Sequence, residues 1–257
     1  MNLEIAFIGF FVGALVGLTG IGGASILTPL LIFLGIPPST AVGTDFLYNS
    51  VTKLTGAIQH IKQKSIDFNI LKLLMVGCLP AAIISNLAFY KLFYKDDYEN
   101  IILIFVGLAL ILSSMITFLF NIKGDRPSRK SSTQKRKHSI LIIGILIGVI
   151  IGVTSIGSGS LIALFLIYFF QIKPSTLVGT DLTIGFFITT VTGLLMMSYG
   201  HIDYLLLMNL LIGSIPGAYL GSKLTLKIYS LYLKTIILTI IFLSGCLLFT
   251  KFILNIS

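Results

Sequence analysis

Two glycine-rich segments of the chain combine residue types that could bind a small anion. They read T-G-I-G-G-A-S from Thr19 to Ser25 and T-S-I-G-S-G-S from Thr154 to Ser160. Glycine lets backbone N–H groups approach a ligand closely, and the start of a following helix adds the positive end of its dipole. Hydroxyl donors come from Thr19, Thr154 and Ser158. The candidate binding residues are Thr19, Gly20, Gly22, Gly23, Ser25, Thr154, Gly157, Ser158, Gly159 and Ser160. The alternative interpretation is that these small residues only allow helices to pack closely.

Polar residues also line one face of the stretch that follows each segment. Helical spacing groups Asp45, Asn49, Thr52 or Lys53, Gly56 and His60 in the first stretch, and Asp181, Gly185, Thr189 and Thr192 in the second. Lys53 stands deep in an apolar stretch, where a charge costs roughly 2.5 to 3.5 kcal/mol on insertion scales. We predict that Asn49, Lys53 and Thr189 contribute to anion binding. The alternative is that Lys53 only serves stability, either by extending its ammonium towards the membrane surface or by pairing with Asp45 or Asp181.

Two acidic residues have two readings each. Asp45 and Asp181 both follow a Gly-Thr pair, at what the hydropathy pattern marks as the start of a helix. An acid there is typical of helix capping. The same carboxylates could instead couple transport to a proton or a cation, and the sequence leaves both interpretations open.

The elements that position these residues occur twice. The segment from Gly13 returns from Gly148, and P-S-T-A-V-G-T-D from Pro38 returns as P-S-T-L-V-G-T-D from Pro174, at offsets of 135 and 136 residues. Matches in one order over a long segment indicate an internal repeat. The chain therefore divides into a first repeat, 1–120, a basic linker, 121–138, and a second repeat, 139–257, within one membrane domain.

Hydropathy indicates that lipid is the solvent for most of the chain. Of its 257 residues, 56% are hydrophobic and 11% are charged, whereas a soluble domain has about 25% charged residues. Ten apolar stretches are predicted, at 5–18, 24–36, 44–61, 69–90, 100–120, 139–154, 159–171, 180–199, 204–222 and 232–254. The last three of each repeat are long enough for a spanning helix, which needs about 20 apolar residues and at least about 17, and the first two of each are short and separated by a glycine-rich break. We expect an all-α polytopic fold.

The charges of the loops predict how the repeats cross the membrane. Lysine and arginine favour the cytoplasmic side, and the linker contains seven of them against one acid. With the linker in the cytoplasm, the loops fit best if each short pair is a re-entrant hairpin followed by three transmembrane helices. The two repeats are then inverted, in a multi-pass protein of the cell membrane with both termini outside. One broken span or two thin spans per repeat are the alternatives.

The sequence lacks the motifs that several other functions require. The net charge of +9 comes mostly from the linker, which argues against a nucleic-acid partner. The chain contains no G-x-x-x-x-G-K-[ST] or H-E-x-x-H pattern, and Cys78 and Cys246 are isolated. We therefore expect no enzyme activity, no cofactor and no metal, with a passive anion channel, or an intramembrane enzyme that uses Asp45 and Asp181, as the alternatives.

In its glycine-rich segments and Gly-Thr-Asp sequences, the chain resembles the TauE/SafE family of sulfite and organosulfonate exporters, also called the toluene sulfonate uptake permease family. The likeness rests on G-x-x-x-G-x-T-G-I-G-G-x-S-I-x-x-P-L-L from Gly13, on A-V-G-T-D from Ala41 and on T-K-L-T-G-A-I-Q-H from Thr52. The second repeat departs from the pattern, with Ser158 in place of Gly23 and Leu164 in place of Pro29, so the half-sites need not bind equally.

The resemblance implies an inner-membrane transporter of small sulfur-containing or carboxylated anions. Combined with the repeats, it predicts secondary transport of sulfite, an organosulfonate or a carboxylated anion by alternating access. The expected partners are this anion and the lipid bilayer, and the sequence leaves open proton coupling and assembly into a homo-oligomer.

Overall fold

Ten helices make up the part of the chain that the structure describes. This computed structural model describes residues 3–20, 23–92, 98–123, 133–170, 172–228 and 231–256. The helices are α1 (Leu3–Thr19), α2 (Gly23–Phe33), α3 (Pro38–Lys62), α4 (Phe68–Leu92), α5 (Tyr98–Lys123), α6 (Thr133–Thr154), α7 (Ser160–Phe169), α8 (Pro174–Ser198), α9 (Tyr204–Ile228) and α10 (Leu231–Ile256). Each predicted apolar stretch corresponds to one helix, and the expected all-α fold is confirmed for the described residues.

The third helix of each repeat begins earlier than the hydropathy pattern predicted. Both α3 and α8 have a proline in their first turn, at Pro38 and Pro174. Proline suits that position because its fixed φ matches a helix and its missing N–H would have no partner there. The amide of Ser39 in α3 donates instead to the Glu99 carboxylate of α5, over 2.8 Å, and the Ser39 hydroxyl donates to the same group.

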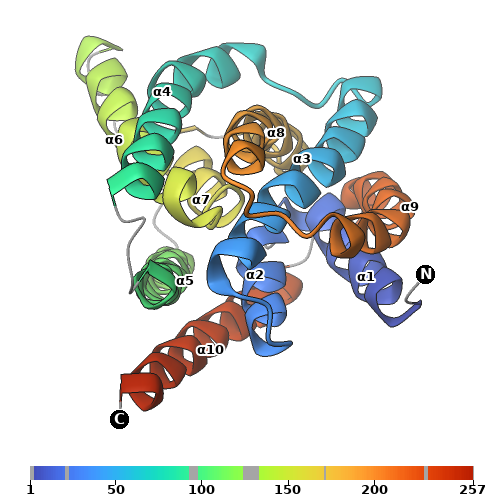
Figure 1. The fold of residues 1–257 in the computed structure, drawn as a ribbon. Coiled ribbons are helices and arrows are strands. Elements are labelled where there is room, and N and C mark those ends of the chain that lie inside the picture. Colours follow the sequence, from blue (N-terminus) through green and yellow to red (C-terminus); the bar gives the residue numbers. More distant parts are fainter. Residues whose placement is uncertain are drawn as a thin grey trace.

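Helices α3 and α8 form the centre of the molecule and pack antiparallel (Figure 1). Near the start of α3, a Cβ at Gly43 would meet the backbone of His201, which follows α8. Midway along both helices, the Ser50 and Thr190 hydroxyls are 2.7 Å apart. At the other end, a Cβ at Gly179 would meet the backbone of Ser65, which follows α3.

The first helix of each repeat packs against the fourth helix of the other repeat. Helix α1 packs against α9, and α6 packs against α4, on opposite sides of the central pair (Figure 1). Both pairs run parallel and meet through glycines spaced four residues apart, which let two backbones approach. These seam glycines are Gly9, Gly13 and Gly17 of α1 with Gly213, Gly217 and Gly221 of α9, and Gly144, Gly148 and Gly152 of α6 with Gly77 of α4.

At each end of the bundle, one hydrogen bond joins the two repeats, and the two bonds involve corresponding residues. At one end the Asp203 amide donates to Thr44 Oγ1 over 3.1 Å, and at the other the Asp67 amide donates to Thr180 Oγ1 over 3.0 Å. Asp203 and Asp67 also cap α9 and α4 through backbone N–H groups of the first turn, as their repeated Ile-Asp sequence suggests. We call the Thr44 end, where α3 begins, the first end, and the Thr180 end, where α8 begins, the second end.

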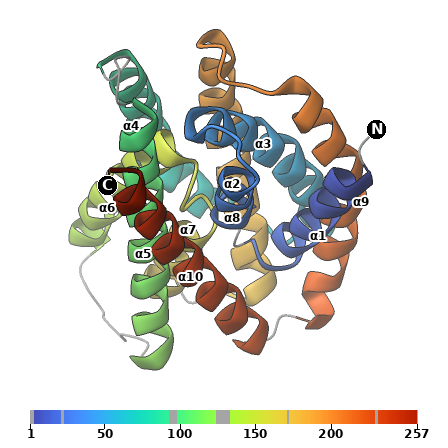
Figure 2. The same ribbon diagram turned by 60° about the horizontal axis from the view of Figure 1, so that its bottom comes forward.

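Each pair of short helices reaches the middle of the bundle and returns to the end from which it came. Helix α1 runs beside α9 from the first end, and α2 leads back to Pro37 at that end. Helices α6 and α7 do the same from the second end, beside α4 and towards the start of α8. Figure 2 shows α5 and α10, which pack antiparallel at the edge of the bundle.

Four described helices are long and apolar enough to cross a membrane, by length and composition. They contain the segments Phe68–Lys91, Glu99–Phe118, Ser175–Ser198 and Tyr204–Leu224. Two of the six predicted spans are not in this set. The apolar part of α10 with described side chains, Thr235–Lys251, is shorter than a span. Helix α3 is as long as α8, but its inner face is polar. Asp45, Asn49, Lys53 and His60 on that face are all at most 1% exposed.

Candidate functional site

The two glycine-rich breaks lie beside the middle of the central helices. Gly20 ends the first hairpin arm with φ +70°, and Ser155, its counterpart in the second repeat, adopts φ +61°. Glycine accepts this left-handed conformation freely, whereas a side chain costs roughly 1 to 2 kcal/mol. The backbone is therefore alike at these two corresponding positions, although one is a glycine and the other a serine.

Two side chains from α3 and α8 face the first break. A Cβ at Gly20 would lie 2.7 Å from Oδ2 of Asp181, and one at Gly23 would lie 2.0 Å from Oδ1 of Asn49. Glycine at both positions therefore allows a carboxylate and an amide to approach the backbone. Gly22, a third predicted binding residue of this break, lies outside the described residues.

Lys53 of α3 faces the second break. Its ammonium donates to the backbone oxygen and to Oγ of Ser158, each over 2.7 Å. A Cβ at Gly185 of α8 would lie 2.5 Å from Lys53 Nζ and 3.0 Å from the Ser158 oxygen. Lys53 thus occupies the space that a side chain at position 185 would fill.

The two aspartates belong to the interior of the site and do not cap helices. Asp45 and Asp181 each lie about two turns inside their helix and are 0% exposed. Capping needs a residue at the helix start, so that interpretation is wrong for both. The hydropathy pattern misplaces both starts because the first turns, which begin at Pro38 and Pro174, are polar and resemble loops.

Each aspartate faces the break of the other repeat. Asp45 accepts a 2.8 Å hydrogen bond from Asn49 Nδ2 and has Ser155 and Thr28 as electrostatic neighbours, whereas Asp181 faces Gly20. The Lys53 ammonium interacts electrostatically with both carboxylates, more strongly with Asp181. One cation is therefore placed between two acids.

Several predicted hydroxyl donors are already used within the fold. The hydroxyls of Thr19, Thr154 and Thr189 each donate to a carbonyl one turn earlier in the same helix. A hydroxyl with its proton engaged can only accept, so these three threonines do not offer a proton to an anion in this conformation. Ser25 and Ser160 are buried at the starts of α2 and α7, and Gly159 precedes α7 without a side-chain cap.

Some buried polar atoms without a hydrogen-bond partner among the described residues lie elsewhere, such as Asn86 Oδ1 and Gln63 Oε1, but seven gather around the breaks. They are Thr28 Oγ1, Asp45 Oδ2, Asn49 Oδ1, Ser155 Oγ, Ser160 Oγ and both carboxylate oxygens of Asp181. Such atoms are rare in folded proteins because leaving them unpaired costs free energy. The cluster is accordingly a candidate ligand site, and its burial closes it to both ends of the bundle in this conformation.

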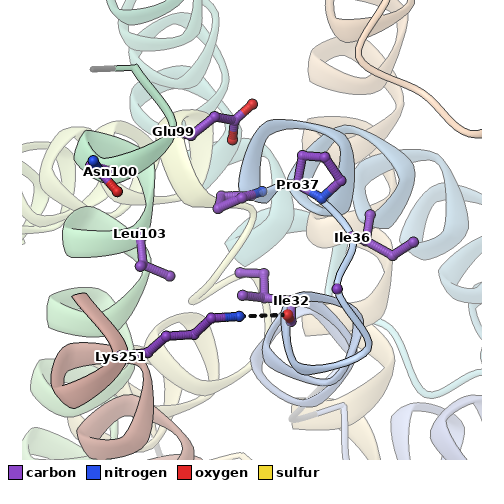
Figure 3. Close-up of a pocket in the computed structure, with 9 residues that line it drawn as sticks. Ile32, Ile36, Pro37, Glu99, Asn100, Leu103 and Lys251 are labelled. Atoms are coloured by element: carbon purple, nitrogen blue, oxygen red, sulfur yellow. Dashed lines mark hydrogen bonds between the residues drawn. The ribbon is translucent and has the colours of Figure 1, made fainter. Parts of the chain in front are cut away.

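A separate pocket of about 180 Å³ opens at the first end, away from the breaks (Figure 3). It lies between the α2–α3 turn, α5 and α10. Lys251 Nζ donates to the Ile32 backbone oxygen across it over 3.1 Å, and Glu99 holds the start of α3 beside it. Both charged groups therefore secure the α2–α3 corner to its neighbours.

Three residues of the site were not among the predicted binding residues. Thr28 and Ser155 flank Asp45, and Gly185 makes room for Lys53. Aligning the repeats position by position gives the signal for Gly185, because Asn49 and Lys53 in one repeat correspond to Gly185 and Thr189 in the other. At one position the second repeat has the smaller residue, Gly185, and one turn later the first repeat has the larger one, Lys53. This pattern suggests that the glycine compensates in volume for the lysine. No group of three or more histidine, cysteine, aspartate or glutamate side chains that could hold a metal occurs in the described part.

Comparison with known proteins links the whole chain to one family. The family profile described as "Sulfite exporter TauE/SafE" matches residues 5–248. The chain is 45% identical over 251 residues to the Bacillus subtilis "Probable membrane transporter protein YjnA", covering 95% of this chain and 98% of that protein. It is 28% identical over 245 residues to "Probable membrane transporter protein YdhB" of the same organism, covering 95% and 98%. A segment of 115 residues is 25% identical to the Arabidopsis thaliana "Sulfite exporter TauE/SafE family protein 1", covering 45% and 26%. No solved structure matches the chain.

Proposed function

The chain is a membrane transporter that belongs to the sulfite exporter TauE/SafE family, and we propose that it moves a small sulfur-containing or carboxylated anion by secondary transport. Sulfite and organosulfonates are the first candidates, because the family description and the name of the Arabidopsis relative refer to sulfite export. The relatives are named as transporters, in agreement with the expectation that the chain is not an enzyme.

The observation that carries this proposal is the position of Lys53. Its ammonium lies at the second break, bonded to Ser158, where α7 begins at Ser160 with no side-chain cap. A cation beside a helix N-terminus is suited to an anion, because both the charge and the dipole attract it. An entering sulfite or sulfonate oxygen would take over the hydrogen bonds that Lys53 now donates to Ser158, and the unpartnered Ser160 hydroxyl would donate to the same ligand.

The arrangement of the repeats supports alternating access. Corresponding helices pack antiparallel, α3 with α8 and α5 with α10, as expected for two inverted repeats. The hairpins α1–α2 and α6–α7 would be re-entrant from opposite sides, with their breaks at mid-depth. Because the site is closed at both ends here, rocking of one half against the other would open it first to one side and then to the other.

Charge supports the orientation in the cell membrane. The second end carries the exposed lysines Lys62, Lys64, Lys173 and Lys223, and the basic linker joins helices at that end. The positive-inside tendency then places the second end in the cytoplasm and both chain termini outside.

The test is anion flux into proteoliposomes that contain the purified protein. Lys53→Gln removes the charge and keeps a hydrogen-bond donor, so we expect sulfite and methanesulfonate flux to fall by about 10- to 100-fold, the usual worth of a hydrogen bond to a charged group. Lys72→Gln is the matched control, because Lys72 is exposed on α4, and its flux should equal that of the unmodified protein.

Equal flux in Lys53→Gln and Lys72→Gln would remove Lys53 from the site. Trans-stimulation distinguishes a transporter from a passive channel: unlabelled anion inside the vesicles should accelerate entry of labelled anion, and a channel would show no such counterflow.

A further inference from the structure

The charges at the centre of the molecule do not balance. Asp45 and Asp181 provide two carboxylates, and Lys53 provides one ammonium, all at most 1% exposed. Unpaired charge in such surroundings is costly because water cannot solvate it. An anion that enters this site would add a second unpaired negative charge unless a proton entered with it.

The two carboxylates are not equivalent as acceptors of that proton. Asp45 accepts the hydrogen bond from Asn49, and this contact favours its ionised form because the donor stabilises the negative charge. Neither oxygen of Asp181 has a hydrogen-bond partner among the described residues. Its carboxylate faces Gly20, where a Cβ would lie 2.7 Å away. Asp181 is therefore the carboxylate whose charge has the weaker support.

Few titratable groups surround Asp181. From α3, Lys53 acts on it electrostatically, and the His60 side chain packs against Gly179, two residues before it. Within the described parts of α1, α4, α6, α7 and α9, no titratable side chain acts on Asp181. When an anion binds to the Lys53 ammonium, the positive charge that partly offsets the Asp181 carboxylate is shared with the anion. The negative charge of Asp181 is then less well stabilised.

We propose that Asp181 takes up one proton when the anion binds and carries it across the membrane with the anion, so that the protein is a proton–anion symporter. The inference rests on the proposed function and adds the coupled ion and its carrier. The carboxylate and a proton form a neutral carboxylic acid on one side, and the same O–H bond breaks on the other side when the anion leaves. Asp45 stays ionised and neutralises part of the Lys53 charge throughout.

One consequence is that transport of a monovalent anion is electroneutral. One negative charge and one proton cross together, so a pH gradient drives accumulation and the membrane potential does not. A transporter that moves the anion alone would show the opposite dependence.

Methanesulfonate is a suitable probe because its sulfonate group stays ionised between pH 5 and 8. Its affinity for the purified protein, measured by titration calorimetry, should fall with rising pH by up to about tenfold per pH unit once free Asp181 loses its proton. Asp181→Asn carries a neutral amide in place of the acid, so its affinity should vary less than about twofold over the same range. The matched variant Asp45→Asn should keep the pH dependence.

Vesicles loaded with a pH-sensitive dye give a second readout that needs no variant. Methanesulfonate influx should bring in one proton per anion, and influx into Asp181→Asn vesicles should bring in none. Anion influx without proton movement in the unmodified protein would overturn the inference and leave the transport proposal standing. Absence of methanesulfonate binding at every pH would instead overturn the proposed substrate class.

Discussion

The two half-sites have the same backbone conformation at one corresponding position and differ in their side chains. Gly20 and Ser155 adopt the same left-handed conformation, and each break is faced by an aspartate from the other repeat. Asn49 approaches the first break, but its counterpart at the second break is Gly185, which has no side chain. The chemistry of the second break comes instead from Lys53, whose counterpart Thr189 bonds to its own helix.

This difference shows how a duplicated frame can hold one asymmetric ligand site. The hydrogen bonds at the periphery, from Asp67 to Thr180 and from Asp203 to Thr44, are the same in both repeats. The pair that distinguishes the half-sites lies at the centre, where Gly185 of one helix accommodates Lys53 of the other. With a single cation in the candidate site, we expect an anion to bind more strongly at the second break than at the first.

The largest effect is expected from filling the space at position 185. Gly185→Ala would place a Cβ within 2.5 Å of Lys53 Nζ and displace the ammonium from Ser158, and overpacking of this kind costs typically 1 to 3 kcal/mol. We expect methanesulfonate flux to fall about 10- to 100-fold. Gly107→Ala is the control, because a Cβ there would have no neighbour closer than 3.5 Å. Normal flux in Gly185→Ala would mean that Lys53 does not need this space.

A smaller effect is expected at the first break. Asn49→Ala removes the hydrogen bond to Asp45, and a hydrogen bond to a charged group is worth about 1.5 to 3 kcal/mol when both partners are buried. Because Lys53 remains, methanesulfonate flux should fall about fivefold, less than the fall of about 10- to 100-fold expected for Lys53→Gln. A loss as large as that of Lys53→Gln would show that both half-sites contribute equally.

The smallest effects, and equal ones, are expected at the periphery. Asp67→Ala and Asp203→Ala each remove an N-cap, which should lower the free energy of unfolding by about 1 kcal/mol. Chemical unfolding of the protein in detergent measures both, and anion flux should be unchanged. Clearly unequal losses of unfolding free energy would indicate that the two ends of the bundle differ in stability although their hydrogen bonds match.

The sequence predicted the helices and the polar face well because both follow local patterns. Apolar stretches and the period of 3.6 residues are enough to bury Asp45, Asn49 and Lys53 on one face. The contacts between repeats were not predictable in this way. The bond from the Asp67 amide to Thr180 Oγ1 joins residues 113 positions apart, and the fit of Lys53 to Gly185 depends on how two helices cross. Of the two interpretations of Asp45 and Asp181, capping is wrong because the pattern of hydropathy marks where a helix becomes apolar, not where it starts.

The exchange of partners between repeats has a consequence for biosynthesis. The glycines of α1 pack against α9, which is encoded about 200 residues later, and ribosomes add about 5 to 20 residues per second. Helix α1 therefore waits about 10 to 40 s for its partner, and α4 waits for α6 until the linker has been made. Neither half can complete its own packing before the other is present. A gene divided at the linker should yield two fragments that become stable only when they are produced together.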